Sequence, residues 1–405
     1  MFRLQKANQI EKRAVVLGKN YSTTLGVVRS LGEQGYKVHV CFVSRSKWQG
    51  YIVGCSRYIM HFTRFESRDD RYIVGSLIKM YKDTREKTPL IASDDYTASL
   101  IDRHLKELLK YFILPCSGLG GGEIVRLMDK SVQISLAQVY GLRTARSWII
   151  TQTDDTYTIP EDVVYPCFFK PLMSFKGGKD GMKRCNSERE LQTELGKLKG
   201  FSVLVQEYLE IEAEYSISGL CWDKQIYLPA LMRKIQISQA HKGTTVMGVI
   251  EPFDLECETY RNLTDLLASL RLKCIVDVEL FYDGKEMIFN EINFRTSAVC
   301  YGIVAGGANI PGMFADTMQS DCFSPRKDHY INYGMRFLCE KAAWDDYIAG
   351  ILNRKELQAL IQEADSYILS NKNDPKPEII FQLVMRILLW KTKLKRLLLL
   401  GKNKD

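Results

Sequence analysis

Hydrophobic and polar positions in the first hundred residues follow two periods, one typical of buried strands and one of helices. Ala14–Leu17, Val38–Val43 and Pro89–Ala92 are short apolar runs of the kind that fill a sheet covered on both faces. Thr23–Gln34 and Tyr96–Tyr111 carry apolar residues at helical spacing. Strands that alternate with helices predict a Rossmann-like domain with a parallel sheet.

Pattern and composition divide the chain into four segments. We expect a first domain at residues 1–117, a second domain at 118–324, a helical segment at 325–374 and a basic tail at 375–405. The second segment begins near a cluster of glycines and holds most of the remaining strand patterns. The predicted fold class is α/β (α+β), with a helical C-terminal extension after the two domains.

Composition is that of an ordinary folded protein, because 46% of the 405 residues are hydrophobic and 26% are charged. The eleven cysteines occur singly, without a CxxC pair, which disfavours zinc, and their odd number disfavours a disulfide framework. The chain shows neither the apolar stretch of a signal peptide nor a run long enough to span a bilayer. We therefore expect a cytoplasmic location.

The formal net charge of +8 is concentrated at the end of the chain. The last 28 residues, from Glu378 to Asp405, contain seven basic and two acidic residues, so they account for five of the eight charges. The remainder is close to neutral, and we expect no nucleic-acid partner.

Candidate phosphate ligands follow an apolar strand. Tyr165–Phe169 runs into Lys170 and Pro171, and a lysine there is costly to bury unless an anion receives it. In the glycine-rich loop that follows, no side chain blocks the backbone N–H groups from a phosphate. Its candidate ligands are Ser174, Lys176, Gly177 and Gly178. Lys130 lies in the first turn of a helix with Asp129 as its predicted N-cap, where the helix dipole favours an anion.

Candidate base and ribose contacts lie between two strands. Phe201–Leu209 runs into a short linker, and a second strand begins at Tyr215. Backbone groups of such a linker can read a flat base, and a nearby carboxylate can take ribose hydroxyls. Glu207 and Glu214 are the candidate carboxylates. Glu210 and Glu212 compete with them, and ordinary surface acids would show the same pattern.

Two strands around Asp283-Gly284 carry the candidate metal ligands. Strand alternation places Glu291 and Asn293 on one face, and Glu279 joins them if the connecting loop has an odd number of residues. We expect a three-residue loop that pairs Tyr282 with Glu286 and brings Glu279 diagonally near Glu291. Two carboxylates and an amide oxygen suit Mg²⁺, and Arg295 could reach a phosphoryl oxygen or a substrate carboxylate.

These motifs occur in the order of the ATP-grasp fold, which the stretch from Asp129 to Asp316 resembles. The motifs that carry the resemblance are Lys130, Phe169-Lys170-Pro171, the glycine loop, Val205–Leu209, Asn290–Arg295 and Gly306–Pro311. Arg29–Gly35 resembles the pre-ATP-grasp domain that precedes it. The branch that fits best is the D-aspartate ligase-like carboxylate–amine ligases, although Phe294 stands where the family often has proline.

The resemblance implies a two-lobed ATP-grasp domain, with ATP and two Mg²⁺ ions, or Mn²⁺ in their place, as cofactors. By position, Lys130, Lys170 and the loop from Ser174 would hold the phosphates. The other implied ligands are Gln206, Glu207, Tyr208 and Leu209 for adenine, Glu214 or else Glu212 for ribose, Glu279, Glu291 and Asn293 for metal, and Lys234 and Arg295 for the transferring phosphate.

The reaction so implied transfers a phosphoryl group from ATP to a small carboxylate, and an amine substrate then displaces phosphate from the acyl phosphate. A bicarbonate-activating enzyme and a non-catalytic, membrane-attached nucleotide-binding scaffold are the alternatives. The tail supports a membrane role, because Ile379–Leu400 has apolar residues at helical spacing with Arg386 and Lys391 among them. The same helix could pack on the protein or on a second subunit in a homodimer.

Overall fold

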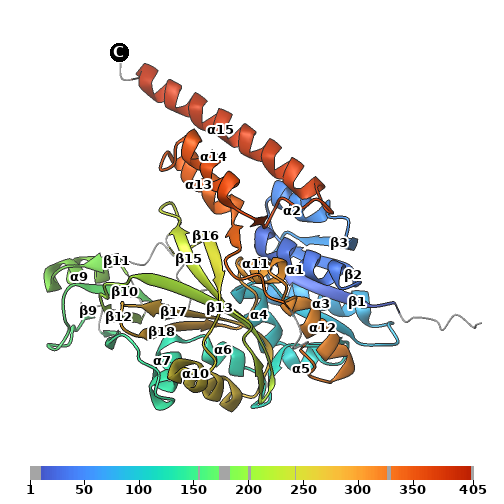
Figure 1. Cartoon of the computed structure of the whole chain (residues 1–405), viewed down its shortest axis with the longest axis horizontal. Helices are drawn as coiled ribbons and strands as arrows, with labels where there is room; N and C mark the ends of the chain where they lie inside the picture. Colours follow the sequence, from blue (N-terminus) through green and yellow to red (C-terminus); the bar gives the residue numbers. More distant parts are fainter. Residues whose placement is uncertain are drawn as a thin grey trace, which may run out of the picture.

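Five parallel strands form the sheet of the N-terminal domain, in the order β3-β2-β1-β4-β5 (Figure 1). Its elements are β1 (Arg13–Gly18), α1 (Tyr21–Glu33), β2 (Lys37–Val43), α2 (Lys47–Gly54), β3 (Ile59–Phe65), α3 (Asp70–Tyr81), β4 (Thr88–Ala92), α4 (Asp95–Arg103), α5 (Leu105–Leu108) and β5 (Phe112–Ile113). The structure, a computed structural model, describes residues 11–153, 156–172, 183–198, 202–241, 243–325 and 330–402. The predicted Rossmann-like domain is confirmed.

Two helices of this domain differ in detail from their predicted ranges. Helix α1 begins at Tyr21, because the side chain of Asn20 caps it by accepting the N–H groups of Ser22 and Thr23. The single helix predicted over 96–111 is two helices, α4 and α5, which are separated at His104.

A small four-stranded antiparallel sheet, with the order β11-β10-β12-β7, forms a lobe with its own core. Its elements are β7 (Ser147–Ile150), β10 (Cys167–Pro171), β11 (Lys183–Cys185), α9 (Glu188–Leu195) and β12 (Val203–Glu207), with the short pair β8 (Gln152–Thr153) and β9 (Thr156–Tyr157) beside them. Two helices precede this lobe in the chain, α6 (Glu123–Leu127) and α7 (Lys130–Val139). As predicted, Asp129 caps α7 by accepting the N–H of Ser131.

A nine-stranded sheet forms the larger lobe. Its strands are β6 (Cys116–Ser117), β13 (Ala213–Asp223), β14 (Gln225–Tyr227), β15 (Leu231–Ile237), β16 (Thr245–Glu251), β17 (Leu272–Tyr282), β18 (Met287–Asn293), β19 (Arg336–Leu338) and β20 (Ser366–Tyr367). Helices α10 (Glu258–Ser269), α11 (Cys300–Ala305) and α12 (Ile310–Ser320) accompany it. Figure 1 shows the small lobe on one side of this sheet and the N-terminal domain on the other.

The N-terminal domain and the larger lobe share their hydrophobic cores. One buried cluster joins Leu25 of α1 to Met232 of β15 and Phe314 of α12, and a second joins Leu17 of β1 to Val278 of β17. Polar contacts add to this interface, since Asp316 accepts hydrogen bonds from the side chains of Lys12, Gln34 and Tyr36. The two parts are therefore packed as one body.

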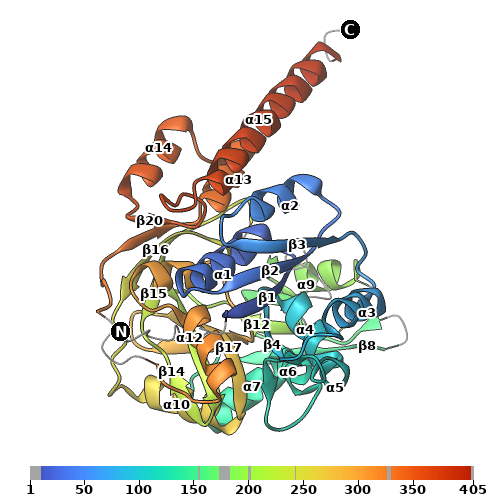
Figure 2. The same ribbon diagram turned by 90° about the vertical axis from the view of Figure 1, so that its right-hand side faces the viewer.

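The C-terminal segment contains the helices α13 (Glu340–Ala349), α14 (Arg354–Glu363) and α15 (Lys376–Lys402). It also supplies β19 and β20, which the sequence did not predict and which extend the nine-stranded sheet. Helix α15 starts against α2 and reaches past α13 and α14, away from the sheets (Figure 2). Among the described residues, no helix is long and apolar enough to cross a membrane.

Candidate active site

Glu279 and Glu291 lie directly opposite one another on β17 and β18. The connection between the strands is four residues long, because Tyr282 pairs with Met287 and not with Glu286 as predicted. A four-residue loop alone would put the two glutamates on opposite faces. A register shift at Glu279 leaves Asn290 as an extra residue on β18, and this bulge restores the shared face. The predicted diagonal arrangement is therefore wrong in register, although the two carboxylates do share a face.

The same face of the sheet carries a lysine between two glutamates. Glu214 of β13 pairs with Lys234 of β15, and Lys234 Nζ lies 3.1 Å from an oxygen of Glu214 and 3.1 Å from an oxygen of Glu279. Burial alone would lower the pKa of Lys234, but the two carboxylates raise it above its ordinary value. Lys234 is therefore a buried, charged group at the centre of the predicted site. Glu212, the alternative ribose ligand, is exposed near the turn at Gly284.

Two more buried lysines approach this face from outside the nine-stranded sheet. Lys130, in the first turn of α7, forms an ion pair with Glu291, and Lys170 at the end of β10 donates to Asn290 Oδ1 at 3.0 Å. The side chain of Gln133 holds α7 in place by bonding both the N–H and the C=O of Ile292. The structure thus brings Lys130, Lys170 and Glu291 together.

Burial and neighbouring charges shift the pKa values of these groups. Burial, followed by the positive charge of Lys130, lowers the pKa of Lys170 to about 8. Burial alone would raise the pKa of Glu291, but Lys130 and Lys170 hold it at about 2. At neutral pH the site therefore contains the charged side chains of Lys170 and Lys234 and the ionised carboxylate of Glu291, and such shifted groups are typical of functional clefts.

Arg295 sits between two aspartates that the sequence analysis did not single out. Its Nε and Nη2 lie 2.9 Å and 3.4 Å from the carboxylate of Asp95, the first residue of α4, and Nη1 lies 3.7 Å from Asp277 Oδ2. Asp277 is 1% exposed and pairs with Asn293 across the strands. Arg295 therefore connects the N-terminal domain to the β17–β18 pair.

Asp277 is held by a cluster of hydroxyl groups. One of its oxygens accepts hydrogen bonds from Ser216 at 2.7 Å, Ser218 at 3.0 Å and Ser297 at 2.8 Å. Burial raises the pKa of Asp277, while the charge of Arg295 opposes that rise. A buried carboxylate with three hydroxyl donors is fixed in position, which makes it a firm support for the arginine.

The linker predicted for adenine begins with the last two residues of β12, an interior strand of the small lobe. Gln206 is buried and donates to Ser147, while Glu207 accepts the backbone N–H of Arg146 at 2.8 Å. Tyr208 is exposed, and the guanidinium of Arg184 lies over its ring, 4.1 Å from the centroid. Both ribose candidates are engaged, Glu207 by the backbone of Arg146 and Glu214 by Lys234, and Glu214 is the one that lies beside Lys234. Leu209 follows as a half-buried residue.

The predicted metal ligands are Glu279, Glu291 and Asn293. Within the described part of the chain, no group of three or more histidine, cysteine, aspartate or glutamate side chains is arranged to hold a metal ion. The predicted set has two facing carboxylates, Glu279 and Glu291, with the amide of Asn293 on the same face. These hard oxygen donors fit Mg²⁺ in kind, although each carboxylate is engaged by a lysine here.

The predicted glycine-rich loop, with Ser174, Lys176, Gly177 and Gly178, lies outside the described residues.

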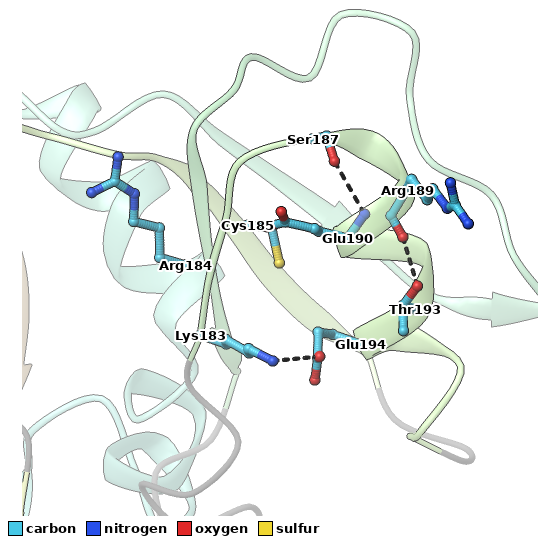
Figure 3. Close-up of a pocket in the computed structure, with 8 residues that line it drawn as sticks. All are labelled: Lys183, Arg184, Cys185, Ser187, Arg189, Glu190, Thr193 and Glu194. Carbon is cyan, nitrogen blue, oxygen red and sulfur yellow. Dashed lines mark hydrogen bonds and ion pairs between the residues drawn. The ribbon is translucent and has the colours of Figure 1, made fainter.

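A surface depression of about 300 Å³ opens elsewhere, on the small lobe between β11 and α9 (Figure 3). It is lined by Lys183, Arg184, Cys185, Ser187, Arg189, Glu190, Thr193 and Glu194, none of which is a predicted site residue.

The residues that the sequence analysis missed left partial signals. Asn290 and Glu291 are two consecutive polar residues between the apolar Phe289 and Ile292, a break in alternation that the bulge at Asn290 explains. Asp277 stands two residues before Glu279 in an apolar strand, so alternation places both on one face. Asp95 carries no such signal, because its partner Arg295 is 200 residues away.

The middle of the chain matches a known protein family. Residues 135–298 match the ATP-grasp domain family. Among curated proteins, the formate-dependent phosphoribosylglycinamide formyltransferase of Wolinella succinogenes is 24% identical over 175 residues, which cover 41% of this chain and 43% of that protein. The carbamoyl phosphate synthase large chain of Thermotoga neapolitana is 22% identical over 247 residues, covering 58% of this chain and 22% of that protein. The chain thus spans less than half of either relative.

Solved structures resemble a larger part of the fold. The N5-carboxyaminoimidazole synthetase of Staphylococcus aureus, complexed with ADP, has a TM-score of 0.63 at 16% identity and covers 85% of this chain and 87% of that one. The L-amino acid ligase of Bacillus licheniformis has a TM-score of 0.58 at 15% identity, covering 77% and 75%. At such low identity these likenesses establish the architecture.

Proposed function

Because residues 135–298 form an ATP-grasp domain behind a parallel-sheet domain, we propose that the chain is an ATP-dependent, ADP-forming carboxylate–amine ligase. The observation that carries the proposal is the facing pair Glu279 and Glu291, with the buried Lys130, Lys170 and Lys234 around it. The substrates are a small carboxylate and an amine.

The nucleotide lies between the two lobes in this proposal. Its adenine rests on the linker Gln206–Leu209, and its ribose meets Glu214. Lys130 and Lys170 approach the phosphates, together with the loop residues Ser174, Lys176, Gly177 and Gly178. The proximity of Lys170 to the bulged Asn290 supports this position, since it brings a charge of the small lobe to the face of the larger sheet.

Magnesium ions, or manganese in their place, would be held by Glu279, Glu291 and Asn293. The charges of the described side chains indicate that ATP would need such added cations. Four positive groups, Lys130, Lys170, Lys234 and Arg295, stand among five acids, Asp95, Asp277, Glu214, Glu279 and Glu291. Such a balance has no excess positive charge for the phosphates of ATP. The metal, when bound, would neutralise charge on the phosphates.

The chemistry follows from positioning and electrostatics. A carboxylate oxygen of the first substrate attacks the γ-phosphorus of ATP and ADP leaves, which gives an acyl phosphate. Lys234 and Arg295 stabilise the negative charge that builds on the transferring group. The amine nitrogen then attacks the acyl carbon, phosphate leaves, and the nitrogen loses its proton. The chain's part is to hold these groups in line and to exclude water from the acyl phosphate.

A hydroxylamine trap tests the proposal without knowledge of the amine. Purified protein, ATP and Mg²⁺ are incubated with D- and L-amino acids and other small carboxylates, and an acyl phosphate appears as a hydroxamate. We expect one carboxylate to react, with the product lost in Glu291→Gln and retained in Glu286→Gln, an exposed acid at the neighbouring turn. ADP release that requires bicarbonate would favour the bicarbonate-activating alternative. ATP binding without turnover of any substrate would favour the scaffold.

A second proposal concerns α15, which presents an apolar stripe to solvent. The side chains of Ile379, Leu383, Ile387 and Trp390 are 64%, 59%, 45% and 64% exposed, at helical spacing. Arg386 and Lys391 are exposed beside them. We propose that the stripe binds an anionic membrane surface. The chain would then sit at the inner face of the membrane, and its amine substrate would be a lipid-linked cell-envelope or polysaccharide precursor. A homodimer through the stripe is the alternative.

A further inference from the structure

The guanidinium of Arg295 is shared by two carboxylates that differ in how firmly they are held. Asp277 is fully buried, and three serine hydroxyls hold it in place. Asp95 is partly exposed, and its carboxylate bonds the guanidinium of Arg295. The inner partner is thus built into the sheet, whereas the outer partner lacks such a cluster of hydroxyl donors among the described residues.

The pair between Asp95 and Arg295 is not what joins the two parts of the molecule. The N-terminal domain and the larger lobe share two hydrophobic cores, and Asp316 adds three hydrogen bonds at the same interface. A partly exposed ion pair contributes little beside such packing. The pair can therefore open without separating the two parts.

The edge of Arg295 that Asp95 occupies is the one best suited to an oxyanion. Its Nε and Nη2 both point at the aspartate, at 2.9 Å and 3.4 Å, in the forked arrangement that arginine forms with carboxylate and phosphoryl oxygens. In this structure a side chain from the N-terminal domain takes the place that such a ligand would take. Any anionic group that approaches this edge must displace it.

We propose that Asp95 is a built-in competitor for the substrate at Arg295. Its carboxylate holds the outer edge of the guanidinium when the site is empty, and it gives way to an oxyanion, either the carboxylate of the substrate or a phosphoryl group. The exchange is a binding property of the chain and does not depend on the reaction. Only the statement that the incoming oxyanion belongs to a ligase substrate rests on the proposed function. Asp277 keeps Arg295 in place during the exchange.

Titration calorimetry with inorganic phosphate and, separately, with acetate tests the exchange. We expect Asp95→Asn to bind one of these probes about three- to tenfold more tightly than the unchanged chain, because it removes a competing charge. The probe that gains identifies the anion as phosphoryl or carboxylate. The gain should vanish in Asp95→Asn combined with Arg295→Gln. Asp95→Ser, which also lacks the charge, should behave as Asp95→Asn does.

Asp70→Asn is the matched control, because Asp70 is also the first residue of a helix and forms a comparable ion pair with Arg103 at 2.7 Å. It should leave the affinity for both probes unchanged. Weaker or unaltered binding in both Asp95 variants would overturn the proposal and leave Asp95 as a support that orients Arg295. If Asp95→Asn binds a probe more tightly but the unchanged chain forms no hydroxamate, the proposed ligase function is wrong and the exchange at Arg295 stands.

Discussion

The guanidinium of Arg29 in α1 and the carboxylate of Asp374, just before α15, form an ion pair 3.0 Å long in which both side chains are at most 1% exposed. Arg29 also donates to the carbonyl oxygens of Ile368, Leu369 and Asp374. Asp374 in turn accepts the hydroxyl of Ser56. One buried arginine thereby ties the C-terminal segment to the N-terminal domain.

Replacing Arg29 with methionine should destabilise the fold strongly. The change leaves the carboxylate of Asp374 buried without its counter-ion, and breaking a buried pair in this way costs about 3–5 kcal/mol. Urea denaturation measures the loss. Arg13→Gln, which breaks the exposed pair with Glu11, should have little effect. A loss below about 1 kcal/mol for Arg29→Met would contradict the role assigned to the pair.

The same pair determines how the membrane proposal is tested. A truncation after Asn373 would remove Asp374 and leave Arg29 unpaired, so substitutions on the exposed stripe are safer. We expect the chain to sediment with phosphatidylserine vesicles and less with neutral ones, and Leu383→Glu with Trp390→Glu to abolish sedimentation. Leu255→Glu, at an exposed leucine elsewhere, is the control.

A different pair of results would favour the homodimer over the membrane proposal. If the chain sediments with neither kind of vesicle but elutes as a dimer in size-exclusion chromatography, and the double variant elutes as a monomer, the stripe is a subunit interface.

Nucleotide binding should weaken as pH rises through about 8. Burial and the charge of Lys130 lower the pKa of Lys170 to about 8, and in the proposed function the nucleotide binds the charged form of this lysine. Below this pH the lysine is already charged, so affinity is constant. Above it, binding requires proton uptake, and affinity falls by up to about tenfold per pH unit. ADP titrations at pH 7 and pH 9 measure the effect. Lys170→Arg, which stays charged, should flatten the profile, and equal slopes for both proteins would exclude Lys170 as its source.

Removal of one facing carboxylate should raise the magnesium requirement. In Glu279→Gln we expect the Mg²⁺ concentration that gives half-maximal ADP binding to rise at least about tenfold, because a charged oxygen ligand becomes a neutral amide. Fluorescence titration of Mg²⁺ at fixed ADP gives the value. Glu286→Gln should behave like the unchanged chain. If Glu279→Gln and Glu286→Gln need the same Mg²⁺ concentration, Glu279 is not a metal ligand.

Local chemistry made much of the fold predictable. The apolar runs that became β1, β2 and β4 are continuous because both faces of that sheet are covered, and the Asp129 cap depends on neighbours two residues apart. Strand alternation places Glu291 and Asn293 on one face, as predicted. The position of Glu279 on that face did not follow from alternation, because the loop has four residues and only the bulge at Asn290 brings Glu279 opposite Glu291.

Contacts between distant residues could not be predicted in this way. Arg29 and Asp374 are 345 residues apart, and nothing in either neighbourhood marks the pair. Asp95 reads as an ordinary first-turn acid until the fold brings Arg295 to it. The short strands β19 and β20 form because β16 offers an edge for β19 to pair with, and β19 in turn pairs with β20. The local sequence of a short strand does not reveal such a distant partner.

The small lobe is packed around residues of its own, including Trp148 and Phe169, whereas the rest of the molecule shares its interior. A body with a separate interior can turn without unpacking its neighbour. Lys170 travels with that body, while Lys234 and Glu279 stay behind on one sheet. If the small lobe turns, the proposed phosphate-binding surface is complete only while Lys170 lies beside the larger sheet. The apparent nucleotide affinity would then be scaled by the fraction of molecules in that position, and a substitution far from the nucleotide would change the affinity by changing this fraction.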